Sequence, residues 1–279
     1  MKYLLLSAAV SLIATSSYAA DAVIVEDVAV ITPDTFTWTG GYIGLNAGYA
    51  WNNGKGIDDP TYFLRDYVGT YENGWFGEES NSNSNSFTGG IQAGYNYQIN
   101  NLVLGIETDF NYIGLKKEYT AITEQSLYAD PDYEYHLDED LHMKTKIEWF
   151  GTIRPRLGFT PSDRLLVYAT GGVAYGKVKS SGGYNWREHG FWWGGPGDHF
   201  FDRNGGFDGS SSKVKLGWTI GAGAEYALTQ NISIKGEYLF VDLGKKSHIA
   251  YSTEEDGEYA TWNDRAKFST VRLGVNYKF

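Results

Sequence analysis

The stretch KVKLGWTIGAGAEYAL, residues 213–228, alternates between two kinds of side chain. Apolar and aromatic side chains take the even positions: Val214, Leu216, Trp218, Ile220, Ala222, Ala224 and Tyr226. Charged, polar or very small residues take the odd positions: Lys213, Lys215, Gly217, Thr219, Gly221, Gly223 and Glu225. Successive side chains of an extended strand point to opposite faces, so this period of two predicts a strand with one apolar and one polar face.

Seven further segments carry this alternation: residues 40–51, 87–98, 102–112, 144–159, 165–178, 232–241 and 270–279. It is weakest at 165–178, where both faces are small or apolar. The links between segments are alternately short and long. The short ones lie at residues 98–101, 160–164 and 229–231, and the long ones near 52–86, 113–143, 179–212 and 244–266. This spacing predicts an all-β fold, an eight-stranded up-and-down antiparallel transmembrane β-barrel with short periplasmic turns and long extracellular loops.

The aromatic residues support a membrane barrel, because they fall into two groups at the two ends of the strands. The loop-side group is Tyr49, Trp51, Phe110, Tyr112, Tyr175, Tyr238 and Phe240. The turn-side group is Tyr95, Tyr97, Tyr226, Tyr277 and Phe279. The alternative is a soluble barrel of the lipocalin type, whose apolar face would line a ligand cavity. That alternative would leave mainly Gly, Gln, Asn and Thr facing water and would not explain the terminal Phe279.

The N-terminus has the pattern of a secretory signal peptide. Lys2 precedes an apolar run at residues 3–14, and Ser17-Tyr18-Ala19 fits the small-x-small cleavage pattern. We therefore expect a signal peptide at residues 1–19, a flexible periplasmic leader at 20–37 and the outer-membrane barrel at 38–279.

Composition excludes several functional classes. The chain has 279 residues, no cysteine and a formal net charge of −11, which argues against nucleic acid as a partner and removes thiolate chemistry. No spacing motif for a catalytic triad or a calcium loop is present, so we expect neither an enzyme nor a metal site. The long links carry most of the negative charge, which indicates a solvated acidic surface.

Three segments resemble a known family: WTGGYIGLNAGYAW at 38–51, GWTIGAGAEYALTQNISIKGEY at 217–238 and VRLGVNYKF at 271–279. They are similar to the small, porin-like outer-membrane β-barrels of Gram-negative bacteria that include outer-membrane immunogenic proteins and hemin-binding proteins. The resemblance implies location in the cell outer membrane, contact with its lipid and insertion by the outer-membrane assembly machinery, with Phe279 as the assembly signal. It also implies a structural or surface-antigen role, with hemin binding and limited diffusion through a small porin as the activities proposed for such proteins.

The polar strand faces place charges of both signs in the predicted lumen. They are Glu107, Asp109, Lys146, Glu148, Arg154, Arg156, Lys215, Glu225, Lys235, Glu237 and Arg272. An eight-stranded barrel is only wide enough to be filled by side chains or one small ligand. We therefore predict that these groups pair into a network that closes the lumen, with a small porin as the alternative.

Histidine is the one residue type that suggests a ligand. All five histidines fall in or beside the predicted loops, and His189 and His199 flank the aromatic run that contains Trp192 and Trp193. Imidazole ligates heme iron and aromatic rings can cover a porphyrin. These four residues are the candidate hemin site, with heme as a bound ligand and not as a required cofactor. The oligomeric state and the surface partners stay open.

Overall fold

The structure is a computed structural model that describes residues 36–53, 58–63, 78–130, 133–193, 198–251 and 259–279. The predicted signal peptide at 1–19 and leader residues 20–35 lie outside the described residues. In the part of the chain that is described, no helix is long and apolar enough to cross a membrane.

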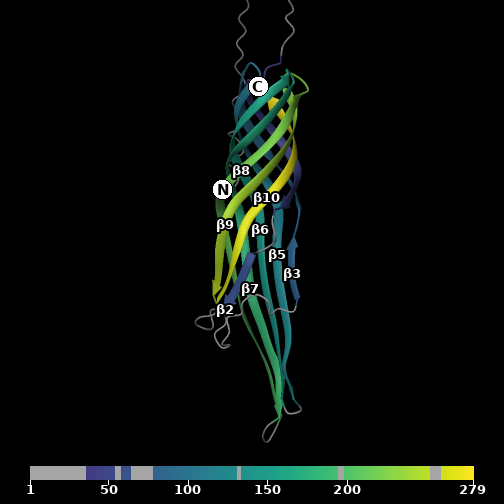
Figure 1. Cartoon of the computed structure of the whole chain (residues 1–279), viewed down its shortest axis with the longest axis vertical. Coiled ribbons are helices and arrows are strands. Elements are labelled where there is room, and N and C mark those ends of the chain that lie inside the picture. The colour runs from purple at the N-terminus through teal and green to yellow at the C-terminus, as the bar shows by residue number, and fades with distance from the viewer. Residues whose placement is uncertain (1–35, 54–57, 64–77, 131–132, 194–197, 252–258) are drawn as a thin grey trace, which may run out of the picture. The chain divides into compact units, whose positions relative to one another are not determined.

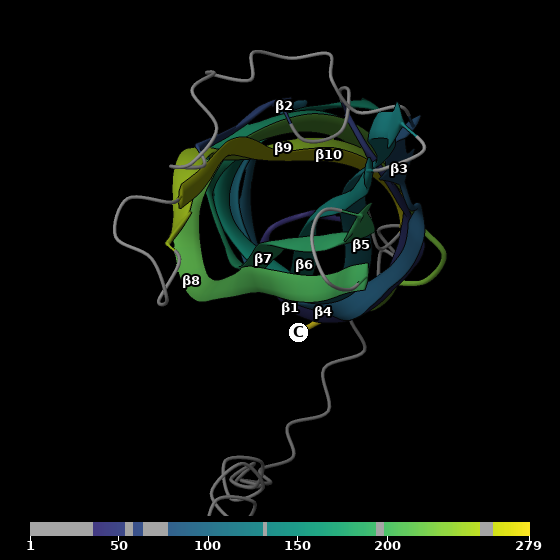
Figure 2. The same ribbon diagram turned by 90° about the horizontal axis from the view of Figure 1, so that it is seen from below.

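Eight strands form the barrel, and each pairs antiparallel with its neighbours (Figures 1 and 2). They are β1 (Gly40–Asn52), β4 (Ser86–Ile99), β5 (Leu102–Asp130), β6 (Tyr133–Ser162), β7 (Leu165–Trp193), β8 (Asp198–Ala227), β9 (Ile232–Tyr251) and β10 (Tyr259–Lys278). The ring closes because β1 pairs with β10 as well as with β4. The predicted eight-stranded up-and-down barrel is confirmed.

Two short strands lie in the predicted long link 52–86. Strand β2 (Asp58–Phe63) pairs with the outer part of β10, and β3 (Glu78–Asn83) pairs with the outer part of β5. Both therefore attach to strand ends at the long-link end of the barrel.

Two of the predicted extracellular loops are long hairpins. Strands β5 and β6 stay paired from Leu102↔Phe159 to Asp130↔Tyr133, and β7 and β8 from Leu165↔Tyr226 to Trp193↔Asp198. Strand β6 also pairs with β7 as far as Tyr133↔Trp192, so the four strands continue as one sheet (Figure 1). We call residues 116–130, 133–146, 179–193 and 198–212 the extracellular ribbon.

The three short turns lie where the sequence predicts them. Asn100 takes a positive φ of 53°, a conformation that Asn tolerates better than most residues. The hydroxyl of Thr229 accepts hydrogen bonds from the backbone N–H groups of Asn231 and Ile232 at 3.2 and 2.9 Å. The third turn connects β6 to β7 at residues 163–164.

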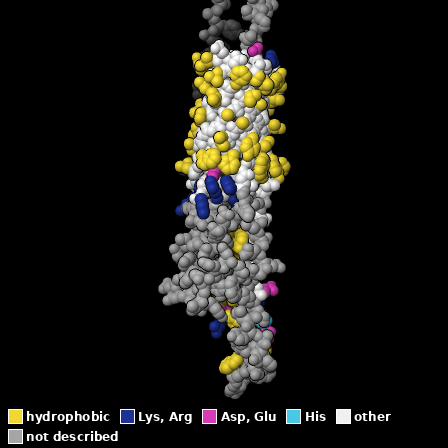
Figure 3. All heavy atoms as spheres, viewed as in Figure 1, with side chains coloured by type: hydrophobic (Ala, Val, Ile, Leu, Met, Phe, Trp, Pro, Cys, Tyr) yellow, Lys and Arg dark blue, Asp and Glu magenta, His cyan; other side chains and the backbone are white. Residues whose placement is uncertain are grey.

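The outward side of the wall is apolar, as the alternation predicts. Leu45, Leu216 and Leu273 are 67%, 73% and 72% exposed, which suits contact with lipid and not with water. Figure 3 shows apolar side chains over the wall, a dense band at the hairpin end and lysine and arginine directly beyond that band.

One irregularity changes which side chains point inward. A register shift between Ile147 and Trp149 inserts an extra residue, Glu148, into β6. Phe150 and Thr152 point inward on one side of this bulge, but Ile147 and Thr145 do so on the other. Lys146 and Glu148 therefore face outward, which contradicts their prediction as lumen residues, because a β-bulge reverses the alternation.

Candidate functional site

The lumen holds a closed charge network of four carboxylates and four cations. All eight residues are buried, with relative exposures of 0–3%: Glu107, Asp109, Glu225, Glu237, Arg154, Arg156, Lys235 and Arg272. A single buried charge in such a space is costly, but equal numbers of both signs within contact distance offset one another. Eight of the eleven predicted lumen residues are thus brought together.

Glu107 is the centre of this network. Its two oxygens lie 2.8 Å from the Lys235 ammonium, and one also lies 2.7 Å from Arg154. Arg154 also donates to Asp109 at 2.8 Å, and Arg272 reaches both Asp109, at 3.0 Å, and Glu237.

Two tyrosines that the sequence reasoning did not single out complete the network. The Tyr42 hydroxyl donates to Glu107 at 2.7 Å, and the Tyr168 hydroxyl donates to Glu237 at 3.0 Å. The Arg156 guanidinium lies 3.9 Å from the centre of the Tyr168 ring and donates to Glu225 at 2.9 Å. A glycine on the neighbouring strand could have indicated from the sequence that Tyr168 points into the lumen. Gly223 on β8 has no side chain and so leaves room for the Tyr168 hydroxyl.

The remaining predicted lumen residues lie elsewhere. Lys215 is on the inward face of β8 but opposite Gly176, near the hairpin end of the barrel. Outward-facing Glu148 pairs with Lys177 at 3.1 Å and Lys179 at 2.8 Å.

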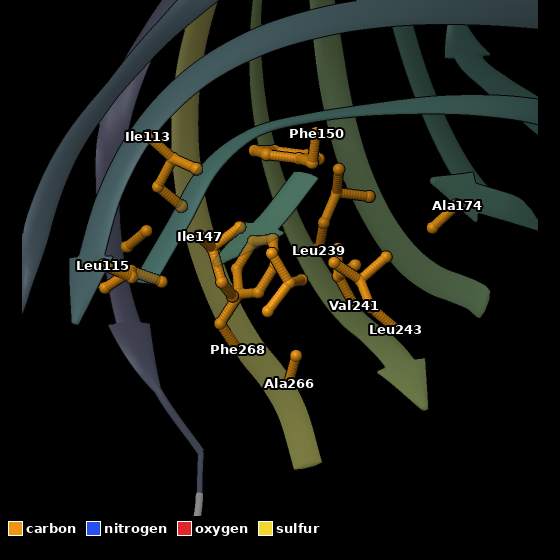
Figure 4. Packing of buried hydrophobic residues seen from close by; sticks show 12 residues of the cluster. Ile113, Leu115, Ile147, Phe150, Ala174, Leu239, Val241, Leu243, Ala266 and Phe268 are labelled. Atoms are coloured by element: carbon orange, nitrogen blue, oxygen red, sulfur yellow. The ribbon is translucent and has the colours of Figure 1, made fainter. Parts of the chain in front are cut away.

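An apolar plug fills the lumen at the hairpin end (Figure 4). Phe150 and Phe268 meet edge to face with ring centres 5.0 Å apart, and both are fully buried. The other residues of the plug are Ala50, Ile113, Leu115, Ile147, Ala174, Val178, Leu239, Val241, Leu243 and Ala266. These side chains come from strands all around the barrel and pack against one another inside it.

An aromatic cluster fills the lumen at the short-turn end. Phe36 and Trp38 are buried and meet edge to face at 4.9 Å. The Trp38 backbone N–H donates to the Gln98 side chain at 2.8 Å, and its indole N–H donates to the carbonyl of Asp163 at 3.1 Å. Phe36 and Thr37, assigned to the leader by sequence, thus belong to the packed unit.

The extracellular ribbon has its own buried side. Leu141, Met143 and Tyr184 are each 1% exposed, and the Tyr184 and Phe207 rings lie 6.0 Å apart. The Tyr184 hydroxyl donates to Glu139, and burial raises the pKa of that carboxyl above its usual value. The ribbon is therefore a packed sheet that projects from the barrel.

The four predicted hemin residues lie at the outer part of this ribbon, but not together. Trp192 is paired with His199 across β7 and β8, and their rings stack at 5.4 Å. His189 is three residues from Trp192, so it lies on the opposite face, where it stacks on His136 at 5.0 Å. The side chain of Trp193 lies outside the described residues.

A carboxylate lies close to each of the two stacked histidines. His136 lies 2.7 Å from Glu134, and His189 lies 3.7 Å from Asp138. Nearby, a hydrogen bond from Arg187 holds the pKa of Asp202 below its usual range. Because His189 and His199 lie on opposite faces, this ribbon does not offer them as joint ligands to one iron.

Known proteins resemble this chain along nearly its whole length. The family model described as "Outer membrane protein beta-barrel domain" matches residues 5–279. The 31 kDa outer-membrane immunogenic protein of Brucella melitensis is 39% identical over 100% of both chains. The 25 kDa outer-membrane immunogenic protein of Brucella abortus is 27% identical over 99% of this chain and 96% of its own. The crystal structure of the outer membrane protein OprG from Pseudomonas aeruginosa is 10% identical, with a TM-score of 0.42, over 88% of this chain and 98% of that one. The chain therefore belongs to the outer membrane β-barrel family and is a protein of the outer membrane.

Proposed function

We propose that this protein is a non-conducting outer-membrane barrel whose role is to display the extracellular ribbon as a surface antigen. The observation that carries the proposal is the filled lumen, in which a neutral charge network lies between an apolar plug and an aromatic cluster. Paired charges and apolar packing remove the groups that would line a water path. The packed ribbon is the part left to meet partners outside the cell.

Conductance tests the closed lumen. Refolded protein in planar bilayers at neutral pH should give no large, steady current, with a larger porin as the positive control for insertion. Reproducible single-channel steps that change when Arg154 or Glu225 is replaced would instead support a small porin.

Surface display can be tested with single cysteines, because the chain has none of its own. Asn204 is exposed on the ribbon and Thr229 is exposed in a short turn at the opposite end. A membrane-impermeant maleimide should label Asn204→Cys on intact cells, and Thr229→Cys only after lysis. Equal labelling of both on intact cells would contradict this orientation.

Hemin binding is the second candidate, favoured by the stacked Trp192 and His199 rings. The site would lie on one face of the ribbon, so its ligand would be His199 without His189. A Soret shift on adding hemin to folded protein should then be lost in His199→Ala and kept in His189→Ala. The absence of a shift in the unmodified protein would remove this candidate.

A further inference from the structure

Three lysines form a row across three neighbouring strands. Lys116 on β5 is the register partner of Lys146 on β6, and Lys146 is the partner of Lys179 on β7. Lys116 and Lys179 are exposed and Lys146 is partly exposed, while the adjacent Thr145 and Ile147 are buried. The row therefore points away from the lumen.

Like charges directly opposite one another destabilise a sheet, so the row requires compensation. Glu148 pairs with Lys177 and Lys179, and Glu118 pairs with Lys144 at 2.7 Å. Among the residues that the structure describes, no carboxylate lies within ion-pair distance of Lys116 or Lys146. This local cationic excess occurs in a chain of net charge −11.

The row lies directly beyond the aromatic girdle. On the same three strands, the Phe110 and Trp149 rings are 5.2 Å apart and the Trp149 and Tyr175 rings are 6.2 Å apart. Trp149 is paired with Lys177 and Lys146 with Lys179, so two residues of β7 separate the ring from the row. A strand rises about 3.3 Å per residue, so the row is roughly 7 Å further along the strands. Aromatic girdles mark the membrane interface, which places these ammonium groups at the level of lipid headgroups.

The wall below the row suits lipid chains. Ile153 on β6 and Val173 on β7 face outward and are 49% and 52% exposed. A molecule with an anionic head and long acyl chains would meet both the cations and this apolar surface. An acidic protein or a free anion would use only the cations.

We propose that Lys116, Lys146 and Lys179 bind the phosphate groups of a phosphorylated glycolipid in the outer leaflet. Ammonium groups are suited to phosphate oxygens, and the bound phosphate offsets the repulsion within the row. The proposal depends on the outer-membrane location and not on whether the lumen conducts.

The test uses the full chain refolded in detergent micelles, with diphosphoryl lipid A as the probe and native mass spectrometry as the readout. Wild-type protein should retain diphosphoryl lipid A and bind its dephosphorylated form much more weakly. Lys116→Gln/Lys146→Gln should weaken retention by about thirtyfold, the effect of removing two basic groups near a charged surface. Lys116→Arg/Lys146→Arg, which keeps the charge, should retain binding.

The matched control is Arg187→Gln/Arg203→Gln, which removes the same charge from exposed positions of the ribbon. It should bind like wild type, and a heat-modifiable gel shift should establish that every variant is folded. Equal binding by the Lys→Gln variant and wild type would overturn the proposal. So would equal retention of the dephosphorylated lipid, or full competition by millimolar inorganic phosphate, which would indicate a simple anion site.

Discussion

At the scale of single residues, the lumen network is the part of the barrel most sensitive to substitution. Arg154→Met removes a cation that contacts both Glu107 and Asp109 and leaves these buried carboxylates with fewer cations to offset the acidic side of the network. Breaking a buried ion pair in this way should lower the free energy of unfolding by about 3–5 kcal/mol. Urea unfolding in lipid vesicles, followed by tryptophan fluorescence, measures the change.

The control for this prediction is Arg187→Met, which removes an exposed arginine paired with Asp202 at 2.7 Å. Its stability should stay close to that of wild type, because exposed pairs contribute little. Equal losses in the two variants would show that the lumen charges are not coupled as the distances indicate.

A second residue-scale prediction concerns the space for Tyr168. A Cβ at Gly223 would lie 2.6 Å from the Tyr168 hydroxyl and 2.7 Å from the Gly236 carbonyl, which is closer than real contacts allow. Gly223→Ala should therefore lower the free energy of unfolding by about 1–3 kcal/mol. Gly236→Ala on the adjacent strand, where the nearest atom would be 3.7 Å away, should not. Urea unfolding measures the stability of both variants. An unchanged free energy of unfolding in Gly223→Ala would mean that the Tyr168 side chain can move aside freely.

At the scale of elements, the extracellular ribbon should respond to pH through Glu139. Burial raises its pKa, so the folded ribbon holds more protons than the unfolded one just above the usual carboxyl pKa. The contribution of Glu139 to ribbon stability should therefore fall as pH rises through that interval. Protection factors of the ribbon amides, which are corrected for the intrinsic pH dependence of hydrogen exchange, should gain at the acid end in wild type relative to Glu139→Gln.

Glu118 provides a control of opposite sign. A hydrogen bond from Lys144 lowers the pKa of Glu118. The stabilisation that Glu118 contributes to the folded ribbon is therefore present above the usual carboxyl pKa and is lost as pH falls. Glu118→Gln should leave the Glu139 effect in place. If the ribbon amides lose as much protection on acidification in Glu118→Gln as in Glu139→Gln, the role of Glu139 is contradicted.

The elements also show what the sequence could predict. Alternation located all eight membrane strands, because lipid on one side and a packed lumen on the other impose a period of two. The same rule failed at Lys146 and Glu148, since a single inserted residue reverses the faces and leaves no clear mark in composition. It also gave no sign that His189 and His199 lie on opposite faces, because their hairpin register was unknown.

At the scale of the whole molecule, assembly depends on closing the ring between the first and last strands. Phe279 lies at this seam: its backbone N–H donates to the Gly41 carbonyl at 3.0 Å. Its ring is 68% exposed and meets Tyr277 edge to face at 5.5 Å. The ring is thus free to be recognised from outside the barrel, while the backbone helps to close it.

These two roles can be separated. Deleting Phe279 removes both the ring and the hydrogen bond, whereas Phe279→Ala removes only the ring and Phe279→Tyr keeps an aromatic ring. If the ring is the assembly signal, the deletion and Phe279→Ala should both reduce the amount of folded, heat-modifiable barrel in the outer membrane, while Phe279→Tyr should insert like wild type. Secretion across the inner membrane should be unchanged in all three, because the signal peptide predicted at residues 1–19 is untouched. Normal insertion of Phe279→Ala, with loss only in the deletion, would instead assign the effect to ring closure through Gly41.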